Sequence, residues 1–301
     1  MLNSFKKIQQ QYIFWLDTLG FAQKTITNYG NRVNDFFKWL NTQNITAINL
    51  LNQNHITTFF ENQETRTDSK FKGKLSASYL NDCFTAIDKL LEFLHQMGAT
   101  GTPIPTNRRI TIDNDNRVRK IQPFTIEEIK LLQAQIQELY PNYDYKHREL
   151  KQQQLQLVFV LFYGCGLRLS EGFKLTAKDL NFNKKTIFVN QGKNYKDRII
   201  PMSDSIYNAL QDYMYNFRNL IKCNHNKLFI QKQITVTVDL KHLHSQIKDE
   251  NIKNKRLSFH ILRHSIATHL LQKGMPIENI ARFLGHNSLT STQIYTHIIN
   301  R

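Results

Sequence analysis

The sequence contains little cysteine, and its three cysteines, Cys83, Cys165 and Cys223, lie far apart without forming a C-x-x-C pair. Such a scattered set argues against a disulfide framework and against a structural zinc site. It suits the reducing conditions of the cytosol, so we expect a cytoplasmic protein.

Long apolar runs, targeting segments and cofactor motifs are also missing. Because no run of about 18 apolar residues occurs, no membrane span is expected. Residues 1–16, MLNSFKKIQQQYIFWL, carry two lysines but have glutamines where a signal peptide needs an apolar core. The sequence offers no metal-ligand cluster and no phosphate-binding glycine loop, so we expect neither a metal nor a nucleotide cofactor.

Acidic residues are scarce relative to basic ones. The 24 Asp and Glu are outnumbered by 40 Lys and Arg, which gives a formal net charge of +16 and a pI near 9.7. A charge so far from neutral informs about partners rather than fold, and the commonest polyanionic partner is nucleic acid. With 41% apolar residues the chain can still build sizeable cores, and its length favours two domains.

Helical periodicity dominates residues 1–100. One apolar stripe runs from Ile26 to Leu40, and a second follows the predicted N-cap Ser76 as far as Gly98, which is well placed to end the helix. Two shorter helices are expected at about residues 4–19 and 54–63. The pattern therefore predicts a small bundle of about four helices whose aromatic side chains form its core.

The pattern changes between residues 101 and 122. Gly101, Pro103 and Pro105 precede a polar, basic stretch, TNRRITIDNDNRVRK (106–120), that has no helical period. Together these features predict a linker. Its basic side chains could follow a phosphate backbone or could simply meet solvent, and the sequence leaves both interpretations open.

A second domain is expected over residues 123–301. Thr125 and Glu128 have the spacing of a capping box at the start of a helix. The segments 185–190 and 198–202 are rich in β-branched residues and flank a polar stretch. They predict a β-hairpin on an otherwise helical domain.

Four short clusters in this second domain stand out, and each of them carries basic side chains. In the last two of them, His260, Arg263 and His264 fall at i, i+3 and i+4 and so share one helix face, while Gly285 is predicted to end a helix just before His286. A helix face with two imidazoles and a guanidinium is unusual for pure scaffolding. The clusters are GCGLRLSEG (164–172), QGKNYKDR (191–198), HILRH (260–264) and LGHNSLTSTQIYTH (284–297).

In this order and at these spacings, the four clusters resemble the tyrosine recombinase (phage-integrase-like) family, and within it the Xer-type two-domain site-specific recombinases. The resemblance is close over about residues 123–299 and rests on helical pattern and size over residues 1–100. It implies a mainly α fold with a small β-sheet or hairpin. The implied parts are a helical DNA core-binding domain (1–100), a basic linker (101–122) and a catalytic domain (123–301).

The resemblance also places the family's active-site residues on this sequence. Of these, GLRLSE supplies Arg168 and the supporting acid Glu171, GKNYKDR supplies Lys193, HILRH supplies His260 and Arg263, LGH supplies His286, and TQIYTH supplies the nucleophile Tyr295. Two guanidiniums can hold the non-bridging oxygens of a phosphodiester in a fixed geometry that lysine cannot match. A phenol with an ordinary pKa of about 10 needs a base, for which His260 is the candidate. Lys193 fits the role of acid toward the leaving 5′-hydroxyl.

The implied function is cleavage and rejoining of double-stranded DNA through a 3′-phosphotyrosyl intermediate, without metal or cofactor. The resemblance further implies a core site with inverted repeats, a dimer on one site and a tetramer that pairs two. Chromosome partition, DNA integration and the need for a partner recombinase or an activator stay open. Two alternatives are a type IB topoisomerase and a non-catalytic DNA-binding protein of recombinase descent.

Overall fold

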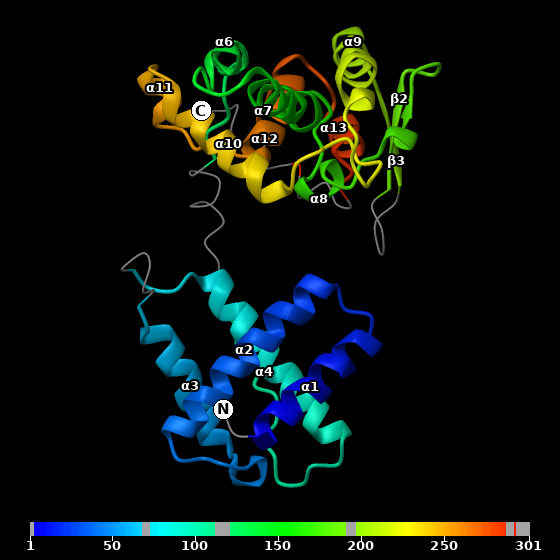
Figure 1. Ribbon diagram of the computed structural model, residues 1–301. Coiled ribbons are helices and arrows are strands. Elements are labelled where there is room, and N and C mark those ends of the chain that lie inside the picture. Colours follow the sequence, from blue (N-terminus) through cyan, green and yellow to red (C-terminus); the bar gives the residue numbers. More distant parts are fainter. Residues whose placement is uncertain (1–2, 68–72, 112–120, 191–196, 287–291, 293–301) are drawn as a thin grey trace. The chain divides into compact units, whose positions relative to one another are not determined.

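The computed structural model separates the chain into two compact units, Met1–Asp113 and Asn114–Arg301, each with its own apolar core (Figure 1). Most of the described chain is helical, and one three-stranded sheet lies in the second unit. The predicted mainly α fold with a small sheet is confirmed. The structure describes residues 3–67, 73–111, 121–190, 197–286 and 292.

The first unit is a helical bundle around aromatic side chains. The Ser76 hydroxyl caps α4 as predicted, since it accepts from the Tyr79 N–H at 3.2 Å, and Gly98 follows the helix end with φ +78°. Phe36 and Phe59 meet edge to face in the core, with ring centroids 4.8 Å apart. Its described helices are α1 (Asn3–Thr18), α2 (Gln23–Thr42), the 3₁₀ helix η1 (Ile48–Leu50), α3 (Gln53–Thr65) and α4 (Ala77–Gln96).

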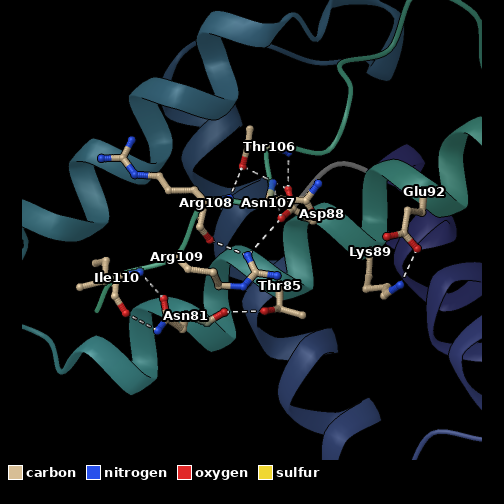
Figure 2. A network of polar contacts seen from close by, with 10 residues as sticks. All are labelled: Asn81, Thr85, Asp88, Lys89, Glu92, Thr106, Asn107, Arg108, Arg109 and Ile110. Carbon is tan, nitrogen blue, oxygen red and sulfur yellow. Dashed lines mark hydrogen bonds and ion pairs between the residues drawn. The ribbon is translucent and has the colours of Figure 1, made fainter. Parts of the chain in front are cut away.

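A polar network fastens the segment that follows α4 back onto that helix (Figure 2). Asp88 is 2% exposed, and its carboxylate accepts from the backbone N–H groups of residues 106 and 107 at 2.8 and 3.1 Å. Arg109 Nη1 lies 3.4 Å from the same carboxylate. Asn81 exchanges two hydrogen bonds with the Ile110 backbone, at 2.7 and 2.9 Å. The first part of the basic segment is therefore bound to the first unit.

The second unit begins its helices at the predicted capping box. Glu128 N–H donates to Thr125 Oγ1 at 3.2 Å, and Thr125 N–H donates to Glu128 Oε2 at 2.8 Å. The described helices are α6 (Ile126–Gln135), η2 (Ile136–Glu138), α7 (Tyr145–Val158), the π-helix η3 (Phe159–Gly164), α8 (Leu169–Gly172), η4 (Ala177–Asp179), α9 (Asp204–Asp212), the π-helix η5 (Tyr213–Phe217), η6 (Arg218–Leu220), α10 (Gln233–Gln246), α11 (Glu250–Lys253), α12 (Phe259–Gln272) and α13 (Ile277–Leu284).

The sheet is antiparallel in the order β1 (Leu180–Asn181), β2 (Thr186–Val189) and β3 (Arg198–Pro201). Pairing of β2 with β3 confirms the predicted hairpin. Ile187 and Ile200 pair on the buried face, whereas Phe188 and Ile199 pair on the exposed one, as the two-residue period of strands requires. Strand β1 was not predicted, because two residues are too short to show a period.

The π-helix η3 continues α7 into the core and delivers the chain to the GCGLRLSE cluster. Its residue Tyr163 contacts α12, where the phenol oxygen lies 3.0 Å from His269 Nδ1. Single turns of π-helix occur often at functional sites, because they shift the side chains that follow. Here η3 fixes where Arg168 begins α8.

Candidate active site

The last turn of α13 has a Schellman arrangement that sets up the site. Gly285 has φ +68°, the left-handed conformation that glycine adopts without strain, and ends the helix as predicted. Its N–H donates to Arg282 O at 3.1 Å, and the His286 N–H donates to Ala281 O at 2.9 Å. The carbonyls of residues 283–285 accept neither of these two bonds, and they lie at the C-terminal end of the helix, which carries partial negative charge.

Each of these three carbonyls accepts a hydrogen bond from a different arginine. The pairs are Arg198 Nε to Phe283 O at 3.1 Å, Arg263 Nη2 to Leu284 O at 2.8 Å, and Arg168 Nη2 to Gly285 O. The arginines come from β3, from α12 and from the residue before α8, which are distant in sequence (Figure 1). Because a helix C-terminus favours cations, the end of α13 gathers three guanidiniums.

One carboxylate lies among these guanidiniums. Glu171, 7% exposed, accepts from Arg168 Nη1 at 2.8 Å and from both terminal nitrogens of Arg198 at 3.0 and 2.9 Å. Arg263 Nη1 lies 4.0 Å from it. Burial raises the pKa of the Glu171 carboxyl, but hydrogen bonds and charge from Arg198, and then bonds from Arg168, bring this pKa down to about 2. Glu171 thus supplies one negative charge against three positive ones.

The local sequence explains how Arg168 reaches the cluster. Gly166 has φ +59°, and a Cβ there would lie 2.8 and 2.9 Å from the side chains of residues 283 and 284. Only glycine permits this close approach. Arg168 then takes the N-cap position of α8, where its N–H donates to Glu171 Oε2 at 2.7 Å. The Gly166 carbonyl accepts from Arg263 Nη1 at 2.5 Å, so the same cluster also positions the second predicted arginine.

His286 directly follows Gly285 and adjoins the guanidiniums. Its Nδ1 lies 2.8 Å from Thr292 Oγ1. Burial lowers the pKa of the His286 imidazole, and the positive charges of Arg263 and Arg168 lower it further, to about 3. The ring is therefore neutral at pH 7, with one nitrogen that donates a hydrogen bond and one that accepts.

The three basic residues of HILRH lie at different depths on α12, which Ser258 caps through a bond from Ile261 N–H at 3.3 Å. Arg263 is 5% exposed, whereas His260 is exposed at the start of the helix. His264 is half-buried, and burial first, then the nearby charges of His260 and Arg263, lower the pKa of its imidazole to about 4. The imidazoles of His260 and His264 therefore lie near each other on α12, whereas the Arg263 side chain is buried in the core.

The described part of the predicted site converges on the end of α13 and the face of α12. Two predicted residues, Lys193 and Tyr295, lie outside the described residues, and their roles stay predictions. The predicted site residues that the structure does place are Arg168, Glu171, His260, Arg263 and His286.

Within the described ranges, no three His, Cys, Asp or Glu side chains are grouped so as to hold a metal ion. No helix described here is long and apolar enough to cross a membrane.

Sequence reasoning missed Arg198, although it lies in the quoted cluster QGKNYKDR. The available signal was the two-residue period of the strand. Arg198 and Ile200 stand on the same face of β3, and Ile200 is buried at 1% exposure. An arginine that faces inward on a strand requires buried hydrogen-bond acceptors, and the sequence alone could not show that Glu171 supplies them.

A cluster of guanidiniums beside a neutral imidazole is suited to binding a phosphate. Guanidiniums form paired, charge-assisted hydrogen bonds to phosphate oxygens. Arg263 is already held by two backbone carbonyls, and Arg168 by Glu171 and the Gly285 carbonyl, so both need little rearrangement when an anion arrives. The geometry therefore supports chemistry in which negative charge develops on phosphate oxygens.

Comparisons with known proteins identify the family of this chain. The phage integrase family matches residues 130–301, and the phage integrase N-terminal SAM-like domain matches residues 10–98. A tyrosine recombinase of Pseudothermotoga lettingae is 30% identical over 77% of this chain and 75% of that protein. The tyrosine recombinase XerC of Bacillus subtilis is 28% identical over 92% of this chain and 87% of that protein.

A solved structure shares the fold. The XerH site-specific recombinase, in a post-cleavage complex with a palindromic difH substrate, superposes with a TM-score of 0.67 and 20% identity, over 91% of this chain and 76% of that one. The relatives are recombinases, which does not favour the topoisomerase alternative. The chain belongs to the phage integrase family of tyrosine recombinases, enzymes that cleave and rejoin DNA.

Proposed function

We propose that this chain carries out site-specific recombination by attack of Tyr295 on a DNA phosphodiester, with the guanidinium cluster at the end of α13 as the phosphate site. The observation that carries the proposal is the convergence of Arg168, Arg198 and Arg263 on one carboxylate and one helix end. Three positive charges against one negative charge suit an anionic ligand.

Arg168 and Arg263 have the role of stabilising the transition state. A phosphodiester carries one negative charge, and its pentacoordinate transition state gathers more charge on the non-bridging oxygens. Both guanidiniums are fixed before the substrate arrives, Arg263 by two carbonyls and Arg168 by Glu171 and Gly285. Such preorganised donors lower the barrier because they do not have to reorient as the charge develops.

His286 adds a neutral donor to the same oxygens. With the pKa of its imidazole near 3, it loses no proton when an oxyanion forms beside it. We assign the Thr292 hydroxyl, 2.8 Å from Nδ1, as the donor of that hydrogen bond, which places the ring proton on Nε2 and makes Nε2 the donor to the phosphate. Burial first, and then the surrounding guanidiniums, keep the ring neutral, so it donates this hydrogen bond without being a source of protons at pH 7.

The proton transfers complete the reaction. The Tyr295 oxygen forms a bond to phosphorus, and its phenol proton passes to His260. The bond from phosphorus to the 5′-oxygen breaks, and Lys193 protonates that oxygen. An incoming 5′-hydroxyl reverses these steps, so rejoining needs no external energy source. General acid–base catalysis of this kind contributes about 10²- to 10⁴-fold in rate.

Double-stranded DNA with an inverted-repeat core site is the proposed substrate. The net charge of +16 fits a polyanion, and the basic segment that follows α4 carries Arg108 and Arg109 on the first unit. The XerH relative is bound to a palindromic site. We accordingly propose a dimer on one site, a tetramer for two, action in the cytoplasm, and a role in chromosome partition or DNA integration.

A plasmid recombination assay tests this function. A supercoiled plasmid carries two direct copies of a short inverted repeat taken from DNA that flanks the gene. The proposal predicts two smaller circles with the wild type and none with Tyr295→Phe. Relaxation of a plasmid that lacks any inverted repeat would instead support a topoisomerase. DNA binding without any change in topology would support the non-catalytic alternative.

A further inference from the structure

Arg198 occupies an unusual position for a residue at the start of an exposed hairpin strand. Its side chain is 8% exposed, and all three of its guanidinium nitrogens are engaged. Nη1 and Nη2 form a two-point contact with the Glu171 carboxylate at 3.0 and 2.9 Å, and Nε donates to Phe283 O at 3.1 Å. The guanidinium therefore bridges β3, α8 and the end of α13.

This arrangement turns Arg198 toward the protein rather than toward a substrate. The two-point contact on Glu171 uses the outer edge of its planar fork, and the carbonyl of α13 takes the inner nitrogen. Glu171 in turn binds both the side chain and the backbone of Arg168, at 2.8 and 2.7 Å. Arg198 thus fixes the carboxylate that orients Arg168.

We propose that Arg198 is a positioning residue for DNA cleavage, which holds Glu171 and the end of α13 so that Arg168 and His286 meet the scissile phosphate. This inference rests on the proposed function of the cluster. Arg198 is the first residue of β3, so the same side chain that holds Glu171 also ties this strand to α8 and the end of α13.

A positive charge at position 198 is not enough to hold both Glu171 and the end of α13. A lysine at position 198 would keep one positive charge near Glu171, but it lacks the planar fork and has no Nε to reach Phe283 O. Without the fork the buried carboxylate loses its two-point contact, and its pKa rises because fewer hydrogen bonds then offset the effect of burial. A protonated Glu171 would no longer hold Arg168 as an anion does.

The chain offers a matched control in Arg218. This arginine is also largely buried and also bonds to backbone carbonyls, with Nε 2.9 Å from Lys227 O and Nη2 2.7 Å from His225 O. It belongs to η6 and contacts neither Glu171 nor α13 in its described hydrogen bonds. Arg218→Lys therefore reproduces the loss of a buried guanidinium without touching the cluster.

The experiment measures single-turnover cleavage of a DNA substrate nicked beside the scissile phosphate, together with DNA affinity and the midpoint of thermal unfolding. We expect Arg198→Lys to slow covalent cleavage by about 10- to 100-fold, the order of loss that follows a small misplacement of reacting groups. DNA affinity should stay within about twofold of the wild type, because all three guanidinium nitrogens of Arg198 are engaged within the protein. Arg218→Lys should cleave at a rate within about twofold of wild type at a comparable unfolding midpoint.

The pH dependence separates positioning from mere stabilisation. In Arg198→Met the pKa of the Glu171 carboxyl rises, so the cleavage rate should begin to fall at a higher pH on the acidic side than it does in the wild type. In a Glu171→Gln background this acidic loss should vanish, and Arg198→Met should cost less than it does in the wild type.

The cleavage rates of Arg198→Lys and Arg218→Lys decide whether Arg198 is a positioning residue. The proposal stands if Arg198→Lys cleaves slowly, binds normally and exceeds the effect of Arg218→Lys. It is overturned if Arg198→Lys cleaves like the wild type, or if its loss equals that of Arg218→Lys. A wild type that never forms an adduct would overturn the proposed function and this proposal with it, whereas a wild-type adduct isolates the contribution of Arg198.

Discussion

Replacing Glu171 with glutamine removes the carboxylate that three guanidiniums share, and we expect the variant to unfold more easily. The pKa of this carboxyl is about 2 in the folded protein against an ordinary value of 4.5. Since a tenfold change in an equilibrium constant corresponds to about 1.4 kcal/mol, this difference amounts to about 3 kcal/mol of stability at pH 7. Loss of one partner from a buried ion pair typically costs a similar amount, about 3 to 5 kcal/mol.

The pH dependence of this contribution has a definite sign. Because the folded-state pKa lies below the unfolded one, the stabilisation is fully present above about pH 5 and is lost as the pH falls toward about 2. The difference in unfolding free energy between the wild type and Glu171→Gln should therefore become smaller in acid, and near pH 3 it should be about half its value at pH 7.

Urea unfolding of the second unit, followed from pH 7 to the lowest pH at which the wild type stays folded, measures this difference. Glu138→Gln provides a control, because Glu138 is exposed and its replacement should change stability by less than about 0.5 kcal/mol. The reasoning is refuted if Glu171→Gln is as stable as the wild type at pH 7. It is equally refuted if the difference grows as the pH falls.

Three further predictions concern the backbone, a histidine and the linker. Gly166→Ala should destabilise the second unit by about 2 to 4 kcal/mol in urea unfolding, because φ is +59° and the new Cβ would press on α13; unchanged stability would contradict this. Because the pKa of the His264 imidazole is lowered in the folded protein, the unfolded state binds a proton at higher pH, and the free energy of unfolding falls as the pH drops below about 6.5. In His264→Gln the loss of unfolding free energy between pH 7.5 and pH 5.5 should be smaller than in the wild type by about 1 kcal/mol, and an equal loss would refute the lowered pKa. Asp88→Asn should speed tryptic cleavage within residues 106–110 by about tenfold or more, because local opening of this segment governs its proteolysis. The control Asp82→Asn, on the exposed face of the same helix, should leave the cleavage rate unchanged, and equal cleavage rates in the two variants would show that Asp88 does not anchor the segment.

Local signals in the sequence were enough to predict much of the fold. The cap at Ser76, the capping box of Thr125 with Glu128, and the helix end at Gly285 depend on residues a few positions apart, and all three are confirmed. The hairpin was predictable for the same reason, since the β-branched residues of its two strands are a local signal, and the pairing of β2 with β3 confirms it.

Contacts between distant residues were not predictable in the same way. Asp88 anchors a segment about twenty residues later through backbone N–H groups, which carry no sequence signature. The meeting of Arg198 with Glu171 depends on the packing of β3 against α8, which no local period encodes. The sequence also indicated no π-helix at Phe159–Gly164, although this turn sets the course toward Arg168.

The composition of the cluster carries a cost in stability that fits a functional site. Burying several guanidiniums around one carboxylate is less stable than an apolar core of similar volume. The backbone carbonyls of α13 offset part of this cost, because they accept bonds from all three arginines. Sites that break a rule of packing in this way are commonly those on which function depends.

The central claim is that Tyr295 attacks a phosphodiester held by this cluster, and identification of the covalent adduct tests it most directly. The wild type and Tyr295→Phe are incubated with nicked duplexes drawn from inverted repeats near the gene, and the adduct is digested and its DNA-linked peptide identified by mass spectrometry. The account predicts an adduct in the wild type alone, with the DNA 3′-phosphate linked to Tyr295. An adduct that persists in Tyr295→Phe, or that maps to another of the twelve tyrosines, would contradict it.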